Sequence, residues 1–312
     1  MIEATKRMAR RLIGAAGLNP TSVAHRVAAV KRKAWQQVDR GADARKLMIN
    51  IGGSNFFKRH WKIMDYRHPS SRHYDFAGMD YSYDLMSLTP MPLASNSVSF
   101  FYSSNTLEHV LDDHLPYIYG EILRCLKPGG AIRIQVPDFD PLYDAFVCDD
   151  RFALMNICGD GAYNRFYAMK TLYGEATARA TLRGWPDKEV LLQGPFTDEA
   201  IAREFLRDFA GHRVGKVTYD QILADARRMS KEAFADCYTQ DATVEWRRAY
   251  PQEHTLWFNH DKLVKGLQQQ GFSTVYRSKA FESRFEEMRG VGKYWAFDHR
   301  RPHSSVFVEA IK

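Results

Sequence analysis

The chain has 312 residues, of which 45% are hydrophobic and 26% charged, and its net charge at neutral pH is +7. This length permits a substantial buried core in one large domain or two, and the composition excludes disordered and collagen-like proteins. No apolar run approaches the roughly 20 residues that a membrane-spanning helix needs. The N-terminus lacks a signal peptide's apolar region and the four cysteines lack CxxC spacing, so we expect a cytoplasmic protein with reduced thiols.

The basic character is concentrated in the first 46 residues, which hold eleven Lys and Arg residues against three acidic ones. The rest of the chain therefore has a net charge of −1, and the overall charge says little about a substrate. Helical spacing within residues 1–45 predicts a basic helical arm of two helices. Such an arm contacts acidic lipid or another polyanion, or it packs on the protein with a solvated basic face. The second interpretation is favoured, because charge runs are usually solvated.

Two short apolar runs follow, and each ends in residues suited to a ligand. The first predicted strand, Lys46–Ile51, ends at Gly52 and Gly53, where glycine permits a positive φ and a close approach of the backbone. The second, Trp61–Met64, ends at Asp65, whose two carboxylate oxygens match the two vicinal hydroxyls of a ribose. Each feature alone also fits a simple turn or cap, but the pair at this spacing favours a nucleotide-binding edge.

A third predicted strand, Val98–Tyr102, is followed by the sequence SSNTLEHV, in which a helix begins. Residues 112–127 have a helical pattern, and a KPGG turn then leads into a strand over Ala131–Val136, which ends at Asp138. The carboxyl ends of parallel strands lie along one edge of a sheet. The small and acidic residues after these strands are therefore expected to lie together at one ligand-binding edge.

The second half of the chain reads differently. Residues 141–253 have mostly helical patterns and many aromatic residues, and an insertion at this point would lie over the carboxyl ends of the strands. We therefore expect a lid or acceptor region there, although a stripe of aromatics is more often core than substrate pocket. A helix around Lys262–Gln269 and a strand over Ser304–Ile311 are predicted at the C-terminal end.

The order of the motifs IGGS, MDY, YDL, SSNTLEHV, LKPGG and IRIQVPD resembles the class I S-adenosylmethionine-dependent methyltransferases, in particular a bacterial type 11-like subgroup with a short glycine loop. LEH followed by LKPGG is the most specific part. The resemblance implies an α/β fold, with a Rossmann-like, mainly parallel seven-stranded sheet, an antiparallel last strand and a helical insertion. It implies a methyltransferase domain formed by residues 46–140 and 254–312, preceded by the arm 1–45 and interrupted by the insertion 141–253.

The resemblance also implies S-adenosylmethionine as cofactor and assigns residues to it. Gly52 and Gly53 match the glycine loop that lies against the methionine part of the cofactor, and Asp65 matches the acid that holds the ribose. Asp84 and Leu85 match the pair beside the adenine, in which the acid accepts the exocyclic amino proton and the apolar neighbour covers the ring.

Further residues match the reacting end of the site. Ser103 and Ser104 correspond to residues that border the sulfonium, and His109 corresponds to the histidine of the LEH motif. Methyl transfer from a sulfonium is an in-line displacement, for which the protein supplies positioning and, for a hydroxyl acceptor, a base. His109 and Asp138 are the predicted catalytic bases, with His254 as a weaker candidate. The alternative for His109 and Asp138 is a structural role at a helix start.

Several alternatives remain open or are disfavoured. Asn50 replaces the family's usual acid, and the glycine loop is short. These two departures favour an alternative to an enzyme: a non-catalytic methyltransferase-like module that acts as an assembly or membrane-associated partner. Asp138 and Asp140 are spaced like a metal pair but lack an evident third ligand, so no metal is predicted. Motifs of DNA methyltransferases and a full GxGxxG are absent, which disfavours a nucleic-acid acceptor and a nicotinamide enzyme. The predicted acceptor is a hydroxyl on a saccharide or another small molecule.

Overall fold

The computed structural model describes residues 46–53, 60–66, 79–158, 197–289 and 304–312. Their strands form one seven-stranded sheet in the order β3-β2-β1-β4-β5-β7-β6. The strands are β1 Leu47–Ile51, β2 Trp61–Asp65, β3 Tyr81–Ser82, β4 Val98–Ser104, β5 Leu126–Pro137, β6 Thr274–Arg277 and β7 Ser305–Ile311. Strands β1 to β5 pair in parallel, and β7 runs antiparallel to both β5 and β6. The predicted fold class is confirmed, whereas the arm 1–45 lies outside the described residues.

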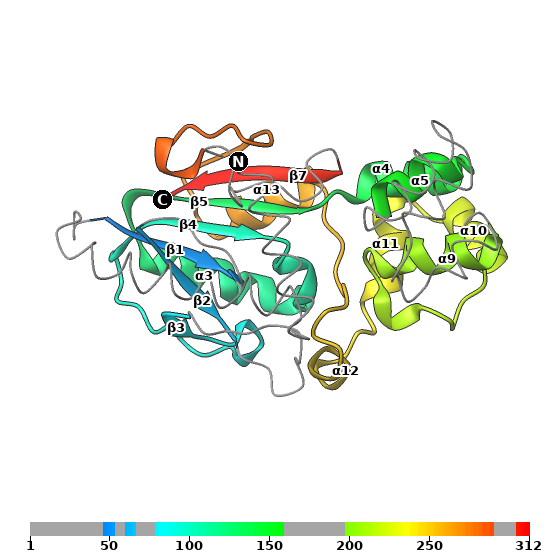
Figure 1. Ribbon diagram of the computed structural model, residues 1–312, viewed down its shortest axis with the longest axis horizontal. Coiled ribbons are helices and arrows are strands. Elements are labelled where there is room, and N and C mark those ends of the chain that lie inside the picture. The colour runs from blue at the N-terminus through cyan, green and yellow to red at the C-terminus, as the bar shows by residue number, and fades with distance from the viewer. Residues whose placement is uncertain (1–45, 54–59, 67–78, 159–196, 290–303) are drawn as a thin grey trace, which may run out of the picture.

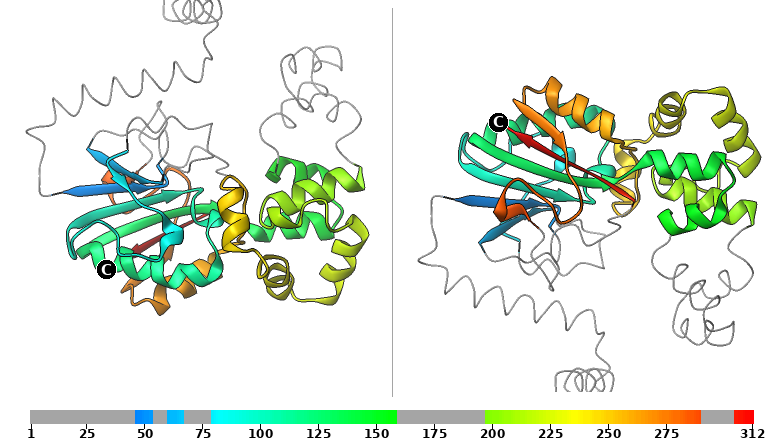
Figure 2. Two further views of the ribbon diagram at one scale, coloured as in Figure 1. Left: turned by 90° about the horizontal axis from the view of Figure 1, so that it is seen from below. Right: turned by 90° about the horizontal axis from the view of Figure 1, so that it is seen from above.

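Helices flank the sheet and extend beyond it (Figure 1). The described α-helices are α3 Leu115–Cys125, α4 Phe139–Val147, α5 Arg151–Cys158, α9 Asp198–Arg207, α10 Tyr219–Arg228, α11 Lys231–Thr239, α12 Val244–Ala249 and α13 His260–Gln269. Short 3₁₀ helices include η2 Leu85–Ser87, η3 Leu107–His109, η4 Asp112–His114, η5 Gly211–Arg213 and η6 Glu286–Met288. Figure 2 shows α3 and α13 together on one face of the sheet. No helix among the described residues has the length and apolarity to cross a bilayer.

The centre of the sheet is buried, as expected for parallel strands covered on both faces, although β5 and β7 also bury the polar residues Arg133, Gln135 and Glu309. Residues 131–137 of β5 are all buried between β4 and β7. The main core runs along β1, β4, β5 and β7 and continues under α3 and α13. This arrangement fixes the ends of β1, β4 and β5, from which the candidate site residues project.

A second core lies beyond the carboxyl ends of the strands, within helices α4, α5, α9, α10 and α11 (Figure 1). Aromatic side chains dominate it, and the rings of Phe146 and Phe205 stack with centroids 4.1 Å apart. Phe139 joins this cluster through Phe209, with ring centroids 4.8 Å apart. The aromatic pattern of the described part of residues 141–253 is therefore explained by packing. The aromatic residues between 159 and 196 lie outside the described residues.

Two helical patterns within residues 141–253 are each interrupted locally. The pattern over 143–157 splits into α4 and α5 at Asp149, which has a left-handed φ of 52°. The pattern over 217–238 splits into α10 and α11 because Met229 is extended and the side chain of Ser230 accepts the Ala233 N–H, which begins a new helix. Helix α9 begins after Thr197, whose hydroxyl accepts the Ala200 N–H and caps the helix.

Candidate cofactor and acceptor site

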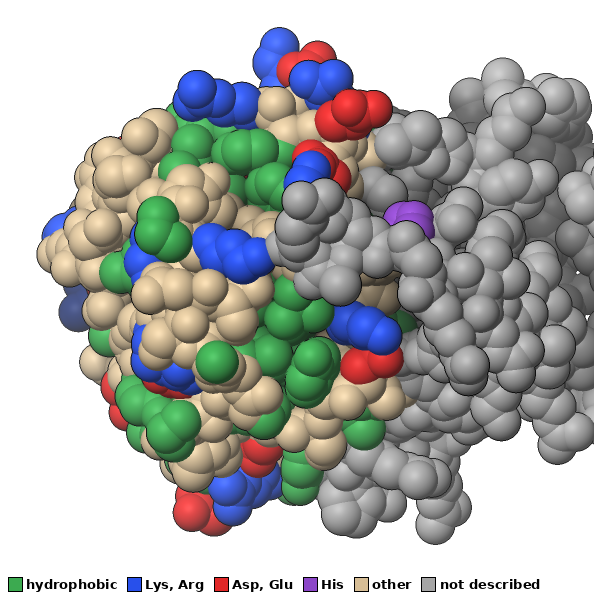
Figure 3. Space-filling model, turned by 90° about the vertical axis from the view of Figure 1, so that its left-hand side faces the viewer, with side chains coloured by type: hydrophobic (Ala, Val, Ile, Leu, Met, Phe, Trp, Pro, Cys, Tyr) green, Lys and Arg blue, Asp and Glu red, His purple; other side chains and the backbone are tan. Residues whose placement is uncertain are grey.

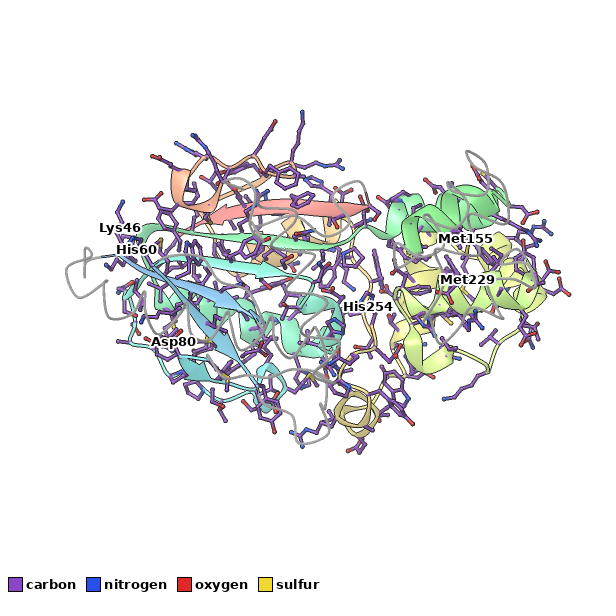
Figure 4. The ribbon with its side chains drawn as sticks, in the orientation of Figure 1. Lys46, His60, Asp80, Met155, Met229 and His254 are labelled. Carbon is purple, nitrogen blue, oxygen red and sulfur yellow. The ribbon has the colours of Figure 1, made fainter. Side chains whose placement is uncertain are left out.

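The carboxyl ends of β1, β4 and β5 point toward the helical part of the molecule (Figure 1). The opposite end of the sheet, where these strands begin, is seen in Figure 3, and on its described part basic and acidic side chains are interspersed. Lys46 and His60 lie at that end, whereas His254 lies between the sheet and the helical part (Figure 4). The sequence-predicted site residues follow or end the strands at the carboxyl edge.

The end of β1 is a tight glycine turn. Gly52 has a φ of 67°, and its N–H donates to the Met64 carbonyl of β2 at 2.9 Å. A Cβ atom at Gly52 would lie 2.2 Å from Oγ1 of Thr106, a residue that follows β4 and whose hydroxyl donates to the Ile51 carbonyl at 3.3 Å. Only glycine satisfies both the backbone angle and the space, so the bare backbone at this point is built into the fold.

Asn50 and Gly53 form the support beneath this turn. Asn50 is 3% exposed, and a Cβ at Gly53 would lie 3.2 Å from its Nδ2 atom and 3.0 Å from Ile63 Cγ2. The amide that replaces the family's usual acid therefore packs directly against the glycine turn. Sequence reasoning identified the substitution but had no means to identify this packing.

The pairing of β2 with β3 brings the predicted ribose and adenine residues close together. Asp65 ends β2, and its carbonyl accepts the N–H of Tyr83, the residue immediately before Asp84. The Asp65 Oδ1 atom accepts the Tyr66 N–H at 2.7 Å, and Asp84 Oδ1 accepts the Met86 N–H at 2.8 Å and caps η2. Leu85 is half-buried in the first position of η2. Each carboxylate is thus oriented by a backbone amide at the same edge.

The two serines are placed differently from the expectation. Ser103 and Ser104 belong to β4 instead of following it. Ser103 is fully buried, and its Oγ has no hydrogen-bond partner among the described residues. The Ser104 hydroxyl donates to Gln135 Oε1 on β5 at 2.8 Å. Continued pairing with β5 extends the strand past its apolar run.

Two histidines and a glutamate meet just beyond β4. His109 and His254 pack edge to face with ring centroids 4.8 Å apart. Their Nε2 atoms each lie 3.9 Å from Oε1 of Glu108, which is 1% exposed. His109 Nδ1 donates to the Glu253 carbonyl at 3.0 Å and His254 Nδ1 donates to the Asp208 carbonyl at 2.7 Å. Because a carbonyl only accepts, these bonds place the proton of each neutral ring on Nδ1 and leave a lone pair on Nε2.

Burial controls the charge of this cluster. It lowers the pKa of His109 well below its usual value, and the nearby His254 and Arg247 lower it further. His109 is therefore neutral at physiological pH. The sequence predicted His109 and His254 as separate candidates and Glu108 only as part of the LEH motif. The structure brings the three side chains together.

Asp138 contacts a different element. It follows β5 and caps α4, with Oδ1 accepting the Asp140 N–H at 3.2 Å. Burial raises the pKa of Asp138. Asp140 is held by Lys231 Nζ at 3.3 Å and by Asn259 Nδ2 at 3.3 Å. The metal-like spacing of Asp138 and Asp140 thus coincides with a helix cap at Asp138 and an ion pair at Asp140. His109 contacts His254 and not Asp138.

Arg247 was missed entirely by sequence reasoning. It lies on the short helix α12, and burial lowers its pKa to about 10, while Asp84 and Glu108 act in the opposite direction. The residue therefore stays cationic at neutral pH, between the predicted adenine residue and the histidine cluster. Its Nε atom is buried with no hydrogen-bond partner among the residues that the structure describes. A single arginine in a polar helix carries no sequence signal of this kind.

A known family matches part of the chain. Residues 64–134, from the end of β2 into β5, match the methyltransferase domain family. No curated protein matches the chain.

Similar solved structures include an S-adenosylmethionine-dependent methyltransferase from Thermotoga maritima, described as a possible histamine N-methyltransferase. It is 12% identical, with 99% of this chain and 97% of that chain covered and a TM-score of 0.35. A methyltransferase from Archaeoglobus fulgidus is 10% identical, with 91% and 94% covered and a TM-score of 0.38. One from Mesorhizobium loti is 19% identical over 36% of this chain and 53% of that chain, with a TM-score of 0.24.

The identification rests on the family match and on the sheet. The matched range includes Asp65 at the end of β2, strand β4, the LEH segment and most of β5. The sheet order places β1, with its glycine turn, at the centre between β2 and β4. Residues 64–134 match the methyltransferase domain family, the sheet is Rossmann-like, and the match implies S-adenosylmethionine as cofactor.

Proposed function

We propose that this protein transfers the methyl group of S-adenosylmethionine to a hydroxyl group on a saccharide or another small molecule. The observation that carries the proposal is the pair of imidazoles beyond β4 whose Nδ1 atoms both contact backbone carbonyls, so that Nε2 of the neutral His109 can accept a proton. A hydroxyl is a weak nucleophile that must lose its proton during methyl transfer, so a proton acceptor at this edge suits such an acceptor.

The described residues fit the cofactor. The glycine turn at Gly52 and Gly53, packed against Thr106, Ile63 and Asn50, is proposed to lie against the methionine part of the cofactor. Asp65, with one carboxylate oxygen oriented by the Tyr66 amide, is proposed to accept the ribose hydroxyls. Asp84 and Leu85 are proposed to lie beside the adenine, and the backbone around Ser103 and Ser104 beside the sulfonium. When bound, the cofactor supplies the activated methyl group.

The protein's own residues then position the acceptor and remove one proton. In the proposed step the acceptor oxygen forms a bond to the methyl carbon, the carbon–sulfur bond breaks, and its electron pair stays on sulfur. The hydroxyl proton moves to Nε2 of His109, whose Nδ1–H stays bonded to the Glu253 carbonyl. Asp138 is the second proposed base, although its Oδ1 atom already caps α4. Catalysis otherwise consists of positioning and exclusion of water.

The helical residues 141–253 are proposed to hold the acceptor. Their described helices lie beyond the carboxyl ends of the strands, and the segment Glu253–Thr255 returns from them to the sheet. The Thr255 N–H donates to the Glu108 carbonyl at 2.9 Å and its hydroxyl donates to the Val110 carbonyl at 3.0 Å. The histidine cluster is therefore shared between the cofactor edge and the proposed acceptor region.

Variants at the two proposed bases test the proposal. The assay measures transfer from methyl-labelled S-adenosylmethionine to a panel of saccharides and hydroxyl metabolites. His109→Asn keeps a donor for the Glu253 carbonyl but removes Nε2, so we expect kcat to fall about 100-fold with cofactor affinity unchanged. His114→Asn, on the neighbouring turn η4, is the control and should retain activity. Transfer only to amines, or full activity of His109→Asn, would contradict the proposal.

Asp138→Ser separates a base from a cap. Serine is as good an N-cap as aspartate, so this variant keeps the start of α4 but loses the carboxylate. If Asp138 removes a proton, kcat falls while the thermal unfolding temperature is unchanged. Unchanged kcat assigns Asp138 to α4 alone and leaves His109 as the base.

A further inference from the structure

We propose that Glu108, His109 and His254 form a binding site for a divalent transition-metal ion. The site consists of Glu108 Oε1, His109 Nε2 and His254 Nε2, with both nitrogens 3.9 Å from the carboxylate oxygen. One possible ligand atom from each residue lies within 4.8 Å of the others. Metal–ligand bonds of about 2.0–2.2 Å place neighbouring ligand atoms roughly 3–3.5 Å apart, so small side-chain rotations close the site.

Both imidazoles are already prepared as ligands. A metal-binding histidine usually donates its second N–H to a carbonyl or carboxylate, which fixes the ring and the tautomer. The Nδ1–H groups of His109 and His254 make this contact with the carbonyls of Glu253 and Asp208. Both Nε2 lone pairs therefore remain for an ion without any change of tautomer. A pair of core histidines with no ligand to bind does not require this shared orientation.

Burial and local charge also favour a cation. Glu108 is 1% exposed, and a buried carboxylate is stable only when positive charge or hydrogen bonds compensate it. The side chains of His109 and His254 are 19% and 18% exposed, whereas Glu108 is buried.

The ligand set indicates the class of ion. Two imidazoles and one carboxylate suit Zn²⁺, Fe²⁺, Co²⁺ or Ni²⁺, whereas Mg²⁺ and Ca²⁺ prefer oxygen ligands alone. Three protein ligands leave at least one coordination position for water or substrate, as in catalytic sites. The prediction of no metal was based on Asp138 and Asp140 alone. It did not include His254 with the LEH motif, because His254 and that motif are far apart in the chain.

One consequence for catalysis rests on the proposed function. An ion held by Glu108, His109 and His254 would supply Lewis-acid chemistry that lowers the pKa of the acceptor hydroxyl, and His109 would then act as a ligand in place of its role as base. The metal site itself does not depend on this role.

Direct metal titration of the full chain tests the site. Protein freed of metal by a chelator is titrated with Zn²⁺ by calorimetry and with Co²⁺ by visible absorption, both without S-adenosylmethionine. We expect one tight ion per chain. Glu108→Gln, His109→Asn and His254→Asn should each weaken binding at least ~10–100-fold and alter the Co²⁺ spectrum, and the two Asn variants keep the backbone hydrogen bonds.

His260→Asn is the matched control, because His260 lies at the start of α13 beside Asp261, outside the cluster. It should bind the ion like the wild type, and circular dichroism verifies that all variants are folded. Equal affinity in wild type and cluster variants, or no saturable binding by wild type, overturns the metal site. If S-adenosylmethionine still binds in that case, the proposed function stands. Tight metal binding without methyl transfer to any hydroxyl supports the site and removes the proposed function.

Discussion

Gly52→Ala is expected to lower the free energy of unfolding by about 2–5 kcal/mol and to abolish measurable binding of S-adenosylmethionine. A left-handed backbone costs a non-glycine residue about 1–2 kcal/mol, and overpacking adds roughly 1–3 kcal/mol. The added methyl would lie 2.2 Å from Thr106 Oγ1, so β1 and the segment after β4 must separate. Thermal unfolding and calorimetric titration measure the two effects.

Gly129→Ala provides the control for backbone strain alone. Gly129 has a φ of 74°, close to that of Gly52, but a Cβ there meets no atom within 4 Å. We expect a loss of only about 1–2 kcal/mol and unchanged cofactor affinity. Equal destabilisation by the two variants, with cofactor binding retained in both, would show that the contact with Thr106 has no role in the site.

Glu309→Ala is expected to lower the free energy of unfolding by about 3–5 kcal/mol, because it leaves a buried arginine without its carboxylate. Arg133 on β5 and Glu309 on β7 are both fully buried, with Nη1 and Oε1 2.7 Å apart. Arg133 also donates to Ser278 Oγ and to the Lys279 carbonyl, and Glu309 accepts from Tyr276. The pair therefore joins β5, β6 and β7 as well as the segment that follows β6.

Chemical denaturation of three variants separates the broken pair from its removal. Glu309→Ala and Arg133→Met each leave one charge buried, whereas the double variant Arg133→Met/Glu309→Leu leaves none. Replacing both partners with apolar groups is often close to neutral, so the double variant should be more stable than either single one. A double variant as unstable as the sum of the single losses would contradict this account.

The strands could be predicted because apolar runs and turn residues determine them locally. The observed strand ends differ from the predicted ones where pairing with a neighbouring strand continues. For example, β4 extends through Ser103 and Ser104 because both residues pair with β5. The helical patterns are interrupted at two residues: Asp149 has a left-handed backbone, and the hydroxyl of Ser230 caps a new helix.

The site could be predicted only as far as motifs follow the strands. Gly52 and Asp65 come directly after or at the end of apolar runs, so their place at the sheet edge follows from the fold. The partnership of His109 with His254, and the approach of Arg247 to Glu108, depend on how the chain returns to the sheet after the helices. Such contacts between distant segments have no local sequence signal.

The most direct test of the account is calorimetric titration of the full chain with S-adenosylmethionine, beside Asp65→Asn and Asp261→Asn. Asparagine at position 65 keeps an acceptor for the Tyr66 N–H but removes the charge proposed to hold the ribose. Asp261, whose side chain is 93% exposed, controls for charge alone. We predict micromolar binding that Asp65→Asn weakens ~10–100-fold, as expected when hydrogen bonds to a charged group are weakened, and that Asp261→Asn leaves unchanged. Absence of binding by folded wild-type protein would contradict the account.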